Sequence, residues 1–122
     1  SVMLGLKLTI VVLDNRGFGC INRLQRATGG APFNNLLENA RHETLPDIDF
    51  ATHAASLGAI AEKVASLGAL EDALRRARAN PRTTVIVIDT DPMISTDAGG
   101  AWWDVAVPEV SERAEVRAAR EQ

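Results

Sequence analysis

The stretch "LTIVVLDNRGFGC", residues 8–20, decides the fold that we expect for this chain. Its first part, Leu8–Asp14, is a nearly continuous apolar run rich in Ile and Val, which is typical of a strand buried on both faces of a parallel sheet. Thr83–Asp89 repeats this pattern and also ends in aspartate, whereas Ala59–Val64 is a weaker third strand. Because ligands bind at the carboxyl ends of the strands in α/β sheets, the two aspartates indicate the edge where we expect a site.

Two helices are predicted between the strands. Asp49 can cap the first helix, which Gly58 ends, and Ser66 can cap the second, which Asn80 and Pro81 end. The second helix carries an apolar stripe that consists of Leu67, Leu70, Leu74 and Ala77. Strands that alternate with helices predict an α/β fold in three layers, with helices on both faces of a parallel sheet of three strands.

Two segments lack a regular pattern. Residues 28–47 form a long loop with a short helix expected around Leu36–Arg41, and a loop of that length is usually functional or mobile. Residues 91–122 form an extended tail that ends in a short charged helix, with Ser111 as its expected cap. Within the tail, Trp102-Trp103 acts either as a hinged lid or as an anchor on the domain or a partner subunit, and we favour the anchor.

Composition excludes several classes of protein. The 122 residues are 46% hydrophobic, enough for a real core, and carry a net charge of −3 with no basic face for nucleic acid. Cys20 is the single cysteine, so no disulfide forms within the chain, and a reducing compartment, the cytoplasm, is expected. The longest apolar run is too short to cross a membrane. The first six residues do not resemble a signal peptide and read like the middle of a longer chain.

The end of the first strand offers oxygen ligands. Asp14 and Asn15 supply carboxylate and amide oxygens, and the turn after them supplies backbone carbonyls, which suits Mg²⁺ bound together with a diphosphate. The pattern Gly17-x-Gly19 resembles the start of a dinucleotide fingerprint, but residue 22 is Asn where that motif needs a third glycine. From the residues alone, a metal site and an ordinary strand exit both stay open, and the strand exit is the more common.

The motif "VVLDNRGFGCI", residues 11–21, resembles the second half of the signature of thiamin-diphosphate-dependent enzymes, in which Gly-Asp-Gly comes first and Asn-Asn follows an apolar strand. The usual form is "VVLNNxGYG", so Asp14 stands in place of the first Asn and Phe18 in place of the Tyr. The resemblance implies that the Asn15 side chain and the Gly17 carbonyl bind Mg²⁺. Asp14 either adds negative charge near the metal or accepts backbone hydrogen bonds. The implied cofactor-binding residues are Asp14, Asn15, Gly17, Phe18, Gly19 and Cys20.

Three further stretches resemble the carboxyl-terminal part of the trihydroxycyclohexane-1,2-dione hydrolase family of inositol catabolism. They are "FNNLL" (33–37), "IDFATHAASLGA" (48–59) and "GGAWWDVAVPEVSERAEVRAA" (99–119). The resemblance implies that residues 1–122 are the carboxyl-terminal part of a diphosphate-binding domain. It also implies thiamin diphosphate and Mg²⁺ as cofactors, a polyol-derived cyclic dione as substrate, and hydrolysis of the C–C bond between its two carbonyls.

The same resemblance predicts that the isolated chain is inactive. Gly-Asp-Gly, which carries the main carboxylate ligand, does not occur in the sequence, and we expect it before Ser1 in a longer parent. In this family the glutamate that activates the cofactor belongs to a separate domain on a neighbouring subunit, so no catalytic residue is assigned. A sheet of three strands leaves apolar surface open, which predicts association into a homo-oligomer.

Three other functions stay open beside this one. An acetolactate-synthase-like carboligase or decarboxylase of the same superfamily would act on pyruvate. A non-catalytic α/β module would bind a nucleotide without depending on Asn15, and a purely structural fragment would bind nothing by itself.

Other polar residues have both a structural and a functional interpretation. Cys20 is expected to be a small buried hydrophobe rather than a nucleophile. His53 is expected on a helix surface and His42 in a loop that can face a substrate, and neither is assigned a catalytic role. Arg23 and Arg26 can meet a phosphate or a product carboxylate, although a solvated helix face is more common.

The pair Asn34-Asn35 imitates the Asn-Asn motif. It does not follow a predicted strand, so we reject it as the metal-binding pair. Because its loop comes directly after the glycine turn, a role on the substrate side stays open.

Overall fold

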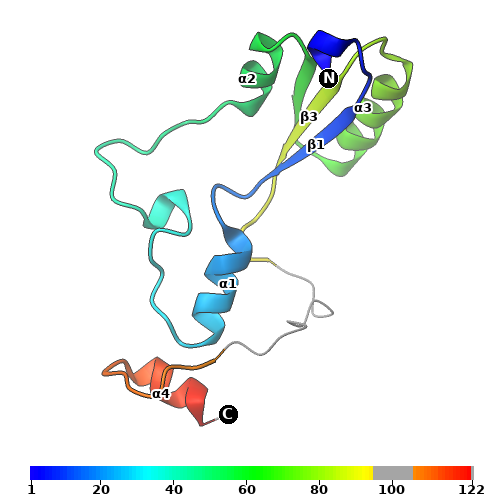
Figure 1. The fold of residues 1–122 in the computed structure, drawn as a ribbon. Helices are drawn as coiled ribbons and strands as arrows, with labels where there is room; N and C mark the ends of the chain where they lie inside the picture. Colours follow the sequence, from blue (N-terminus) through cyan, green and yellow to red (C-terminus); the bar gives the residue numbers. More distant parts are fainter. Residues whose placement is uncertain (95–105, 122) are drawn as a thin grey trace. The chain divides into compact units, whose positions relative to one another are not determined.

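The computed structural model describes residues 1–94 and 106–121 of the chain (Figure 1). The chain divides into two compact units. The first, called the sheet unit, consists of Ser1–Asp14 and Asp47–Thr90, and the second, called the helical unit, consists of Asn15–Pro46 and Asp91–Gln122. Trp102-Trp103, interpreted above as an anchor or a lid, lies outside the described residues.

The sheet unit contains the three predicted strands. They are β1 (Thr9–Asp14), β2 (Ile60–Val64) and β3 (Thr84–Asp89), in the order β1-β3-β2. Both neighbouring pairs are parallel, and the register of β1 on β3 runs from Thr9 beside Thr84 to Asp14 beside Asp89. The prediction of a parallel sheet from the Ile- and Val-rich runs is therefore confirmed.

The helices of the sheet unit are α2 (Phe50–Ser56) and α3 (Leu67–Ala79), and a short 3₁₀ helix, η1 (Val2–Leu4), precedes β1. Both predicted caps are present. The Asp49 carboxylate accepts from the Thr52 backbone N–H at 2.9 Å, and the Ser66 hydroxyl oxygen accepts from the Ala69 backbone N–H at 3.2 Å. These bonds satisfy amide groups that the first turn of a helix leaves without a partner.

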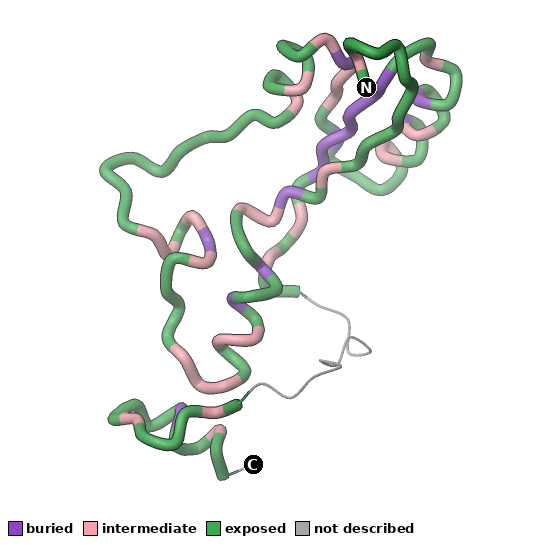
Figure 2. Tube along the Cα trace, viewed as in Figure 1, coloured by how far each residue is buried: buried purple, intermediate pink, exposed green. Residues whose placement is uncertain are grey.

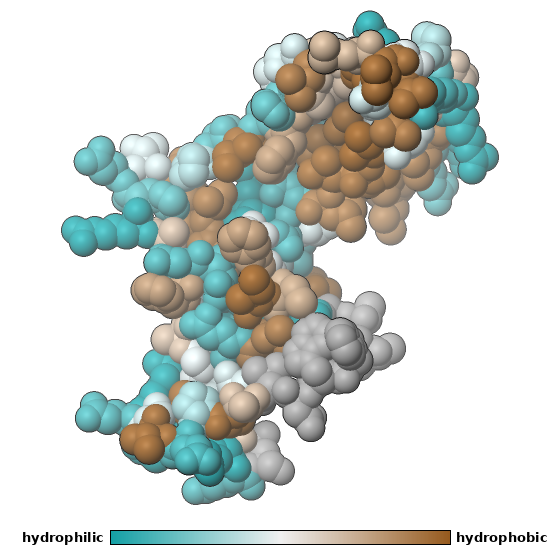
Figure 3. Space-filling view, viewed as in Figure 1, coloured by the Kyte–Doolittle hydropathy of each residue, from teal (hydrophilic) through white to brown (hydrophobic). Residues whose placement is uncertain are grey.

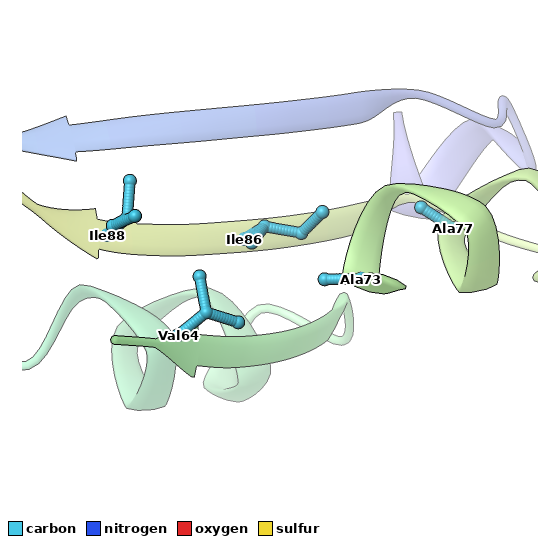
Figure 4. Close-up of a cluster of buried hydrophobic side chains, with 5 residues drawn as sticks. All are labelled: Val64, Ala73, Ala77, Ile86 and Ile88. Atoms are coloured by element: carbon cyan, nitrogen blue, oxygen red, sulfur yellow. The ribbon is translucent and has the colours of Figure 1, made fainter. Parts of the chain in front are cut away.

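The two faces of β3 pack against different helices. Ile86 and Ile88 face one way and pack with Val64 of β2 and with Ala73 and Ala77 of α3 (Figure 4). Small alanines let α3 approach the sheet closely. Burial of a side chain such as Ile86, which is fully covered, stabilises the fold by about 1.5–3 kcal/mol.

The opposite face of β3 presents Val85 and Val87. They pack with Ala59, and partly buried Ala51 and Ala54 of α2 complete this cluster together with Val2 of η1 and other small apolar residues. Helices therefore cover both faces of the sheet. The predicted three-layer α/β/α arrangement is confirmed for the sheet unit.

Burial differs between the strands. Figure 2 shows the buried run along β3, the central strand. In β1, Leu13 is 63% exposed and Ile10 40%, so this sheet of three strands leaves apolar surface open, as expected. Among the strands of residues 1–94 and 106–121, β1 lies at the edge of the sheet and pairs only with β3. Leu67, expected in the apolar stripe of α3, is also exposed because it is the first residue of that helix.

The helical unit contains α1 (Gly19–Ala27), a 3₁₀ helix η2 (Leu37–Asn39) and α4 (Ala114–Arg120). The helix expected around Leu36–Arg41 is thus a single 3₁₀ turn. The short terminal helix is present as α4, although Ser111 is not its N-cap and instead accepts from the Arg113 backbone N–H at 3.1 Å.

The two chain segments of the helical unit meet at Gly29. The Arg113 side chain donates to the Gly29 carbonyl at 2.8 Å. A Cβ atom on Gly29 would lie 2.4 Å from the backbone of Glu115 in α4, so only glycine permits this approach. Within residues 1–94 and 106–121, no helix is long and apolar enough to cross a membrane.

Candidate functional site

The turn that follows β1 is closed by its own asparagine. The Asn15 amide oxygen accepts from the Gly17 backbone N–H at 3.2 Å. Arg16 adopts φ 57° and Gly17 φ 155°, so both stand in backbone regions that favour glycine. A side-chain amide that bonds the backbone two residues later stabilises such a turn.

The turn is held against the long loop by a bridge between Gly17 and Leu36. Phe18 N–H donates to the Asn35 carbonyl at 2.6 Å, and Leu37 N–H donates to the Arg16 carbonyl at 2.9 Å. Neither bond uses the Gly17 carbonyl. That oxygen is therefore left by the bridge for another partner.

Two glycines of the turn have no room for a side chain. A Cβ on Gly17 would lie 2.3 Å from the Asn35 carbonyl oxygen. A Cβ on Gly19 would lie 2.6 Å from the Asn15 amide nitrogen, so the Asn15 side chain lies directly over the start of α1. The glycine spacing that the sequence shows thus serves two close approaches within the helical unit.

The donor atoms of this turn suit a hard cation. The Asn15 amide oxygen keeps a second lone pair beside its bond to Gly17, and the Gly17 carbonyl adds another oxygen. Mg²⁺ prefers such oxygen ligands and keeps several waters or phosphate oxygens. The described residues contain no group of three or more His, Cys, Asp or Glu side chains that could hold a metal. The donors in the turn are instead an amide and a carbonyl oxygen, and they fit Mg²⁺ bound together with a diphosphate.

Asp14, the remaining predicted residue before the turn, belongs to the sheet unit. It is buried at the end of β1, and its backbone carbonyl accepts from the Thr90 N–H at 2.8 Å. Asp14 stands beside Asp89 in the sheet, and the Asp89 carboxylate pairs with Lys63 at 2.9 Å. The carboxyl edge of the sheet therefore gathers polar residues, as the strand endings predicted.

Phe18 and Cys20 flank the start of α1. The Phe18 side chain is 68% exposed. Cys20 is a free cysteine and is exposed, so the expectation of a buried hydrophobe is wrong. The reason is that Cys20 lies on the outer side of α1, where its sulfur accepts from the Arg23 guanidinium at 3.9 Å.

The histidines lie outside the turn. His42 is exposed in the loop, where its ring Nε2 contacts the Leu37 carbonyl at 3.0 Å. His53 lies on the surface of α2, as expected.

The pair Asn34-Asn35 does not follow a strand, and Asn35 holds the turn through its backbone carbonyl. This backbone role was not predicted. It is a long-range contact, and the sequence signals it only through the length of the loop.

The chain belongs to the thiamine pyrophosphate enzymes. Residues 1–88 match the family model described as "Thiamine pyrophosphate enzyme, C-terminal TPP binding domain". This match and the parallel α/β sheet confirm the predicted fold class and support thiamin diphosphate as the cofactor.

Within this family, the chain is similar to hydrolases of one name. The chain is 36% identical to 3D-(3,5/4)-trihydroxycyclohexane-1,2-dione hydrolase 2 of Bacillus cereus. It is 37% identical to 3D-(3,5/4)-trihydroxycyclohexane-1,2-dione hydrolase of Bacillus anthracis, and each alignment spans 121 residues. These alignments cover 94% of this chain and 19% of each relative, so the chain spans about a fifth of their length. No solved structure matches the chain significantly.

Proposed function

We propose that this chain is the carboxyl-terminal part of the diphosphate-binding domain, residues 1–122, of a hydrolase that depends on thiamin diphosphate and Mg²⁺. The substrate is a cyclic 1,2-dione, trihydroxycyclohexane-1,2-dione, in the degradation of myo-inositol. The observation that carries the proposal is the 36–37% identity over 94% of the chain to hydrolases of that name. An acetolactate-synthase-like enzyme of the same superfamily is the alternative, and the identity to the named hydrolases favours the dione as substrate.

Asn15 and Gly17 are the residues that would hold Mg²⁺ in this proposal. The turn supports the role because its two oxygen donors come from an amide bonded within the turn and from a carbonyl that the loop bridge does not use. Gly19 and Cys20 open α1, and backbone N–H groups at a helix start favour phosphate oxygens. Phe18 and Asp14 flank the turn on either side.

When bound, thiamin diphosphate supplies the chemistry that breaks the bond between two carbonyl carbons. The residues of this chain bind and orient its diphosphate end. No residue in these 122 is assigned as the acid or base. We therefore propose that the isolated chain does not turn over substrate.

We also propose that the chain functions in a cytoplasmic homo-oligomer. A single, free cysteine fits a reducing compartment. In the sheet unit, hydrophobic side chains gather at the surface (Figure 3). They include exposed apolar residues of β1 and of the segment before it, namely Met3, Leu4, Leu6, Leu8, Ile10 and Leu13. Exposed apolar surface of this kind marks an interface.

Substrate turnover by the full-length enzyme tests the reaction. We expect it to consume the cyclic dione and to leave pyruvate unchanged. Consumption of pyruvate instead would replace the proposal with a carboligase or decarboxylase, and nucleotide binding without any turnover would replace it with a binding module.

Cofactor binding tests the site separately from the reaction. In the same full-length enzyme, Asn15→Ala should weaken binding of thiamin diphosphate in the presence of Mg²⁺ and leave little difference between solutions with and without Mg²⁺. Asn34→Gly, at the rejected asparagine pair, is the control and should bind as the parent does, because glycine removes the side chain and tolerates the positive φ of 53° at this position. Unchanged Mg²⁺-dependent binding in Asn15→Ala would remove Asn15 from the site.

A further inference from the structure

The helical unit contains a cavity of about 400 Å³ beside α1. Among the described residues it is lined by Asn22, Arg23, Arg26, Ala27, Pro92 and Met93. Its volume is in the range of small-molecule sites. The glycine turn contributes none of these lining residues, so the cavity is separate from the proposed Mg²⁺ site.

Asn22 is the buried polar group of this cavity. Its side chain is only 2% exposed, and its amide oxygen has no hydrogen-bond partner among the described residues. A buried acceptor without a donor is costly, so native proteins keep very few of them. Asn22 is also a poor helix former within α1. Because Asn22 lines the cavity, a donor group of a bound ligand is one way to satisfy this amide oxygen.

The two arginines of the cavity are positively charged hydrogen-bond donors, whereas the Asn22 amide oxygen is an acceptor. Arg23 and Arg26 are exposed, and within the described part of the chain their guanidinium groups contact sulfur atoms, which are weak acceptors. Arg23 reaches the Cys20 sulfur at 3.9 Å, and Arg26 reaches the Met93 sulfur at 3.3 Å. Planar guanidinium donors spaced three residues apart on one helix suit a carboxylate.

One class of ligand satisfies both sides of the cavity. Its carboxylate accepts from the arginines, and its hydroxyl group donates to Asn22. A simple carboxylate lacks the hydroxyl, and a neutral polyol lacks the charge. We propose that this cavity binds a polyhydroxylated carboxylic acid, with Arg23 and Arg26 on the carboxylate and the Asn22 amide oxygen on a hydroxyl.

The ligand class matches the product of the proposed reaction. Hydrolysis of the bond between two carbonyls of a hydroxylated ring adds OH to one carbonyl carbon and H to the other. The product is an open chain with a carboxylate at one end, an aldehyde at the other, and its hydroxyls retained. The assignment of this cavity as a site for the reaction product rests on the proposed function. The assignment as a site for hydroxy acids depends only on Asn22, Arg23 and Arg26.

Calorimetric titration of the 122-residue chain with D-gluconate tests the inference, with acetate and myo-inositol as probes that each carry only half of the chemistry. We expect gluconate to bind clearly more tightly than either. Arg23→Gln and Arg26→Gln should each weaken gluconate binding about tenfold, the effect of losing one charged hydrogen bond. Arg82→Gln, at an exposed arginine of the sheet unit, is the matched control and should bind as the parent does.

Asn22→Leu separates binding from folding. Leucine has the same branching and the same number of side-chain heavy atoms as asparagine, and the buried amide oxygen has no partner to lose among the described residues. The chain should therefore fold and fail to distinguish gluconate from acetate. The inference is overturned if gluconate does not bind, if it binds no more tightly than acetate, or if the two arginine variants bind it unchanged. The titration contains neither thiamin diphosphate nor Mg²⁺, so its failure is distinct from a failure of the cofactor-binding test.

Discussion

At position 17, only glycine allows the long loop to approach the turn of the candidate site closely. A methyl group there would meet the Asn35 carbonyl oxygen at 2.3 Å, which is far inside van der Waals contact. The backbone would have to move, and the bridge to Leu36 would open with it. The glycine is thus required by a neighbour that is distant in sequence as well as by its own dihedral angles.

Gly17→Ala should therefore destabilise the chain by more than the backbone strain of alanine at a positive φ, which is about 1–2 kcal/mol. Gly5→Ala is the matched control, because Gly5 also has a positive φ of 64° but nothing within 4 Å of its Cβ position. Urea unfolding of both variants measures the difference. Equal losses would show that the Asn35 contact adds nothing.

A second prediction for a single residue concerns the effect of Asn22 on the stability of the chain rather than on ligand binding. Asn22→Leu removes a buried acceptor that has no partner among the described residues and introduces a better helix former in α1. The free energy of unfolding of the ligand-free chain should rise by about 1 kcal/mol. A loss of stability in thermal or urea unfolding would mean that the amide is well satisfied and would contradict the account of the cavity.

Among the secondary-structure elements, α2 carries a cap that depends on pH. The pKa of the Asp49 carboxyl is held below its ordinary value of 3.8, first because the Thr52 backbone N–H donates to it and then because the Thr52 hydroxyl does. A lowered folded-state pKa stabilises the fold above the unfolded-state value. That contribution is lost as the pH falls through the folded-state pKa, which lies below 3.8.

Asp49→Asn should remove this part of the pH dependence, since asparagine caps helices about as well but does not titrate. Unfolding midpoints of the parent and the variant at about pH 5 and about pH 2.5 provide the comparison. The parent should lose more stability than the variant on acidification. Parallel losses would show that the Asp49 carboxylate does not contribute.

Local signals made most of the elements predictable. The Ile- and Val-rich runs of β1 and β3, and the caps at Asp49 and Ser66, depend on residues close in sequence, and the structure contains all of them. Open apolar surface on a sheet of three strands was expected, but which strand would carry it was not predictable in the same way. The exposure of a strand depends on which strands stand beside it, and the periodicity of a run carries no information about neighbours.

The same difference between local and long-range determinants applies to the candidate site. Asn15, Gly17 and Gly19 could be predicted because the motif is continuous. The Asn35 carbonyl and the buried amide of Asn22 could not, since one acts through its backbone across a long loop and the other through burial. The single sequence signal for Asn22 is a poor helix former inside a helix.

For the whole molecule, the exposed apolar residues of β1 predict self-association. Leu13→Lys places a charge on an exposed apolar position of the edge strand and should shift the chain toward the monomer, because lysine at an edge opposes further pairing. Leu67→Lys, at an exposed leucine of α3, is the matched control and should leave the mass unchanged. Light scattering provides the measurement. A parent chain that is strictly monomeric and binds no hydrophobic dye would contradict the prediction.

The division of the chain into two units affects which segments of its gene can be exchanged separately. The chain passes between the units at Asp14–Asn15, at Pro46–Asp47 and at Thr90–Asp91, so neither unit is one continuous stretch of a gene. A recombination event that moved only the segment with α1 would leave behind α4 and its contact with Gly29. Sequence change at Gly29 is therefore constrained by α4, although the chain reaches α4 only after it has completed the sheet unit.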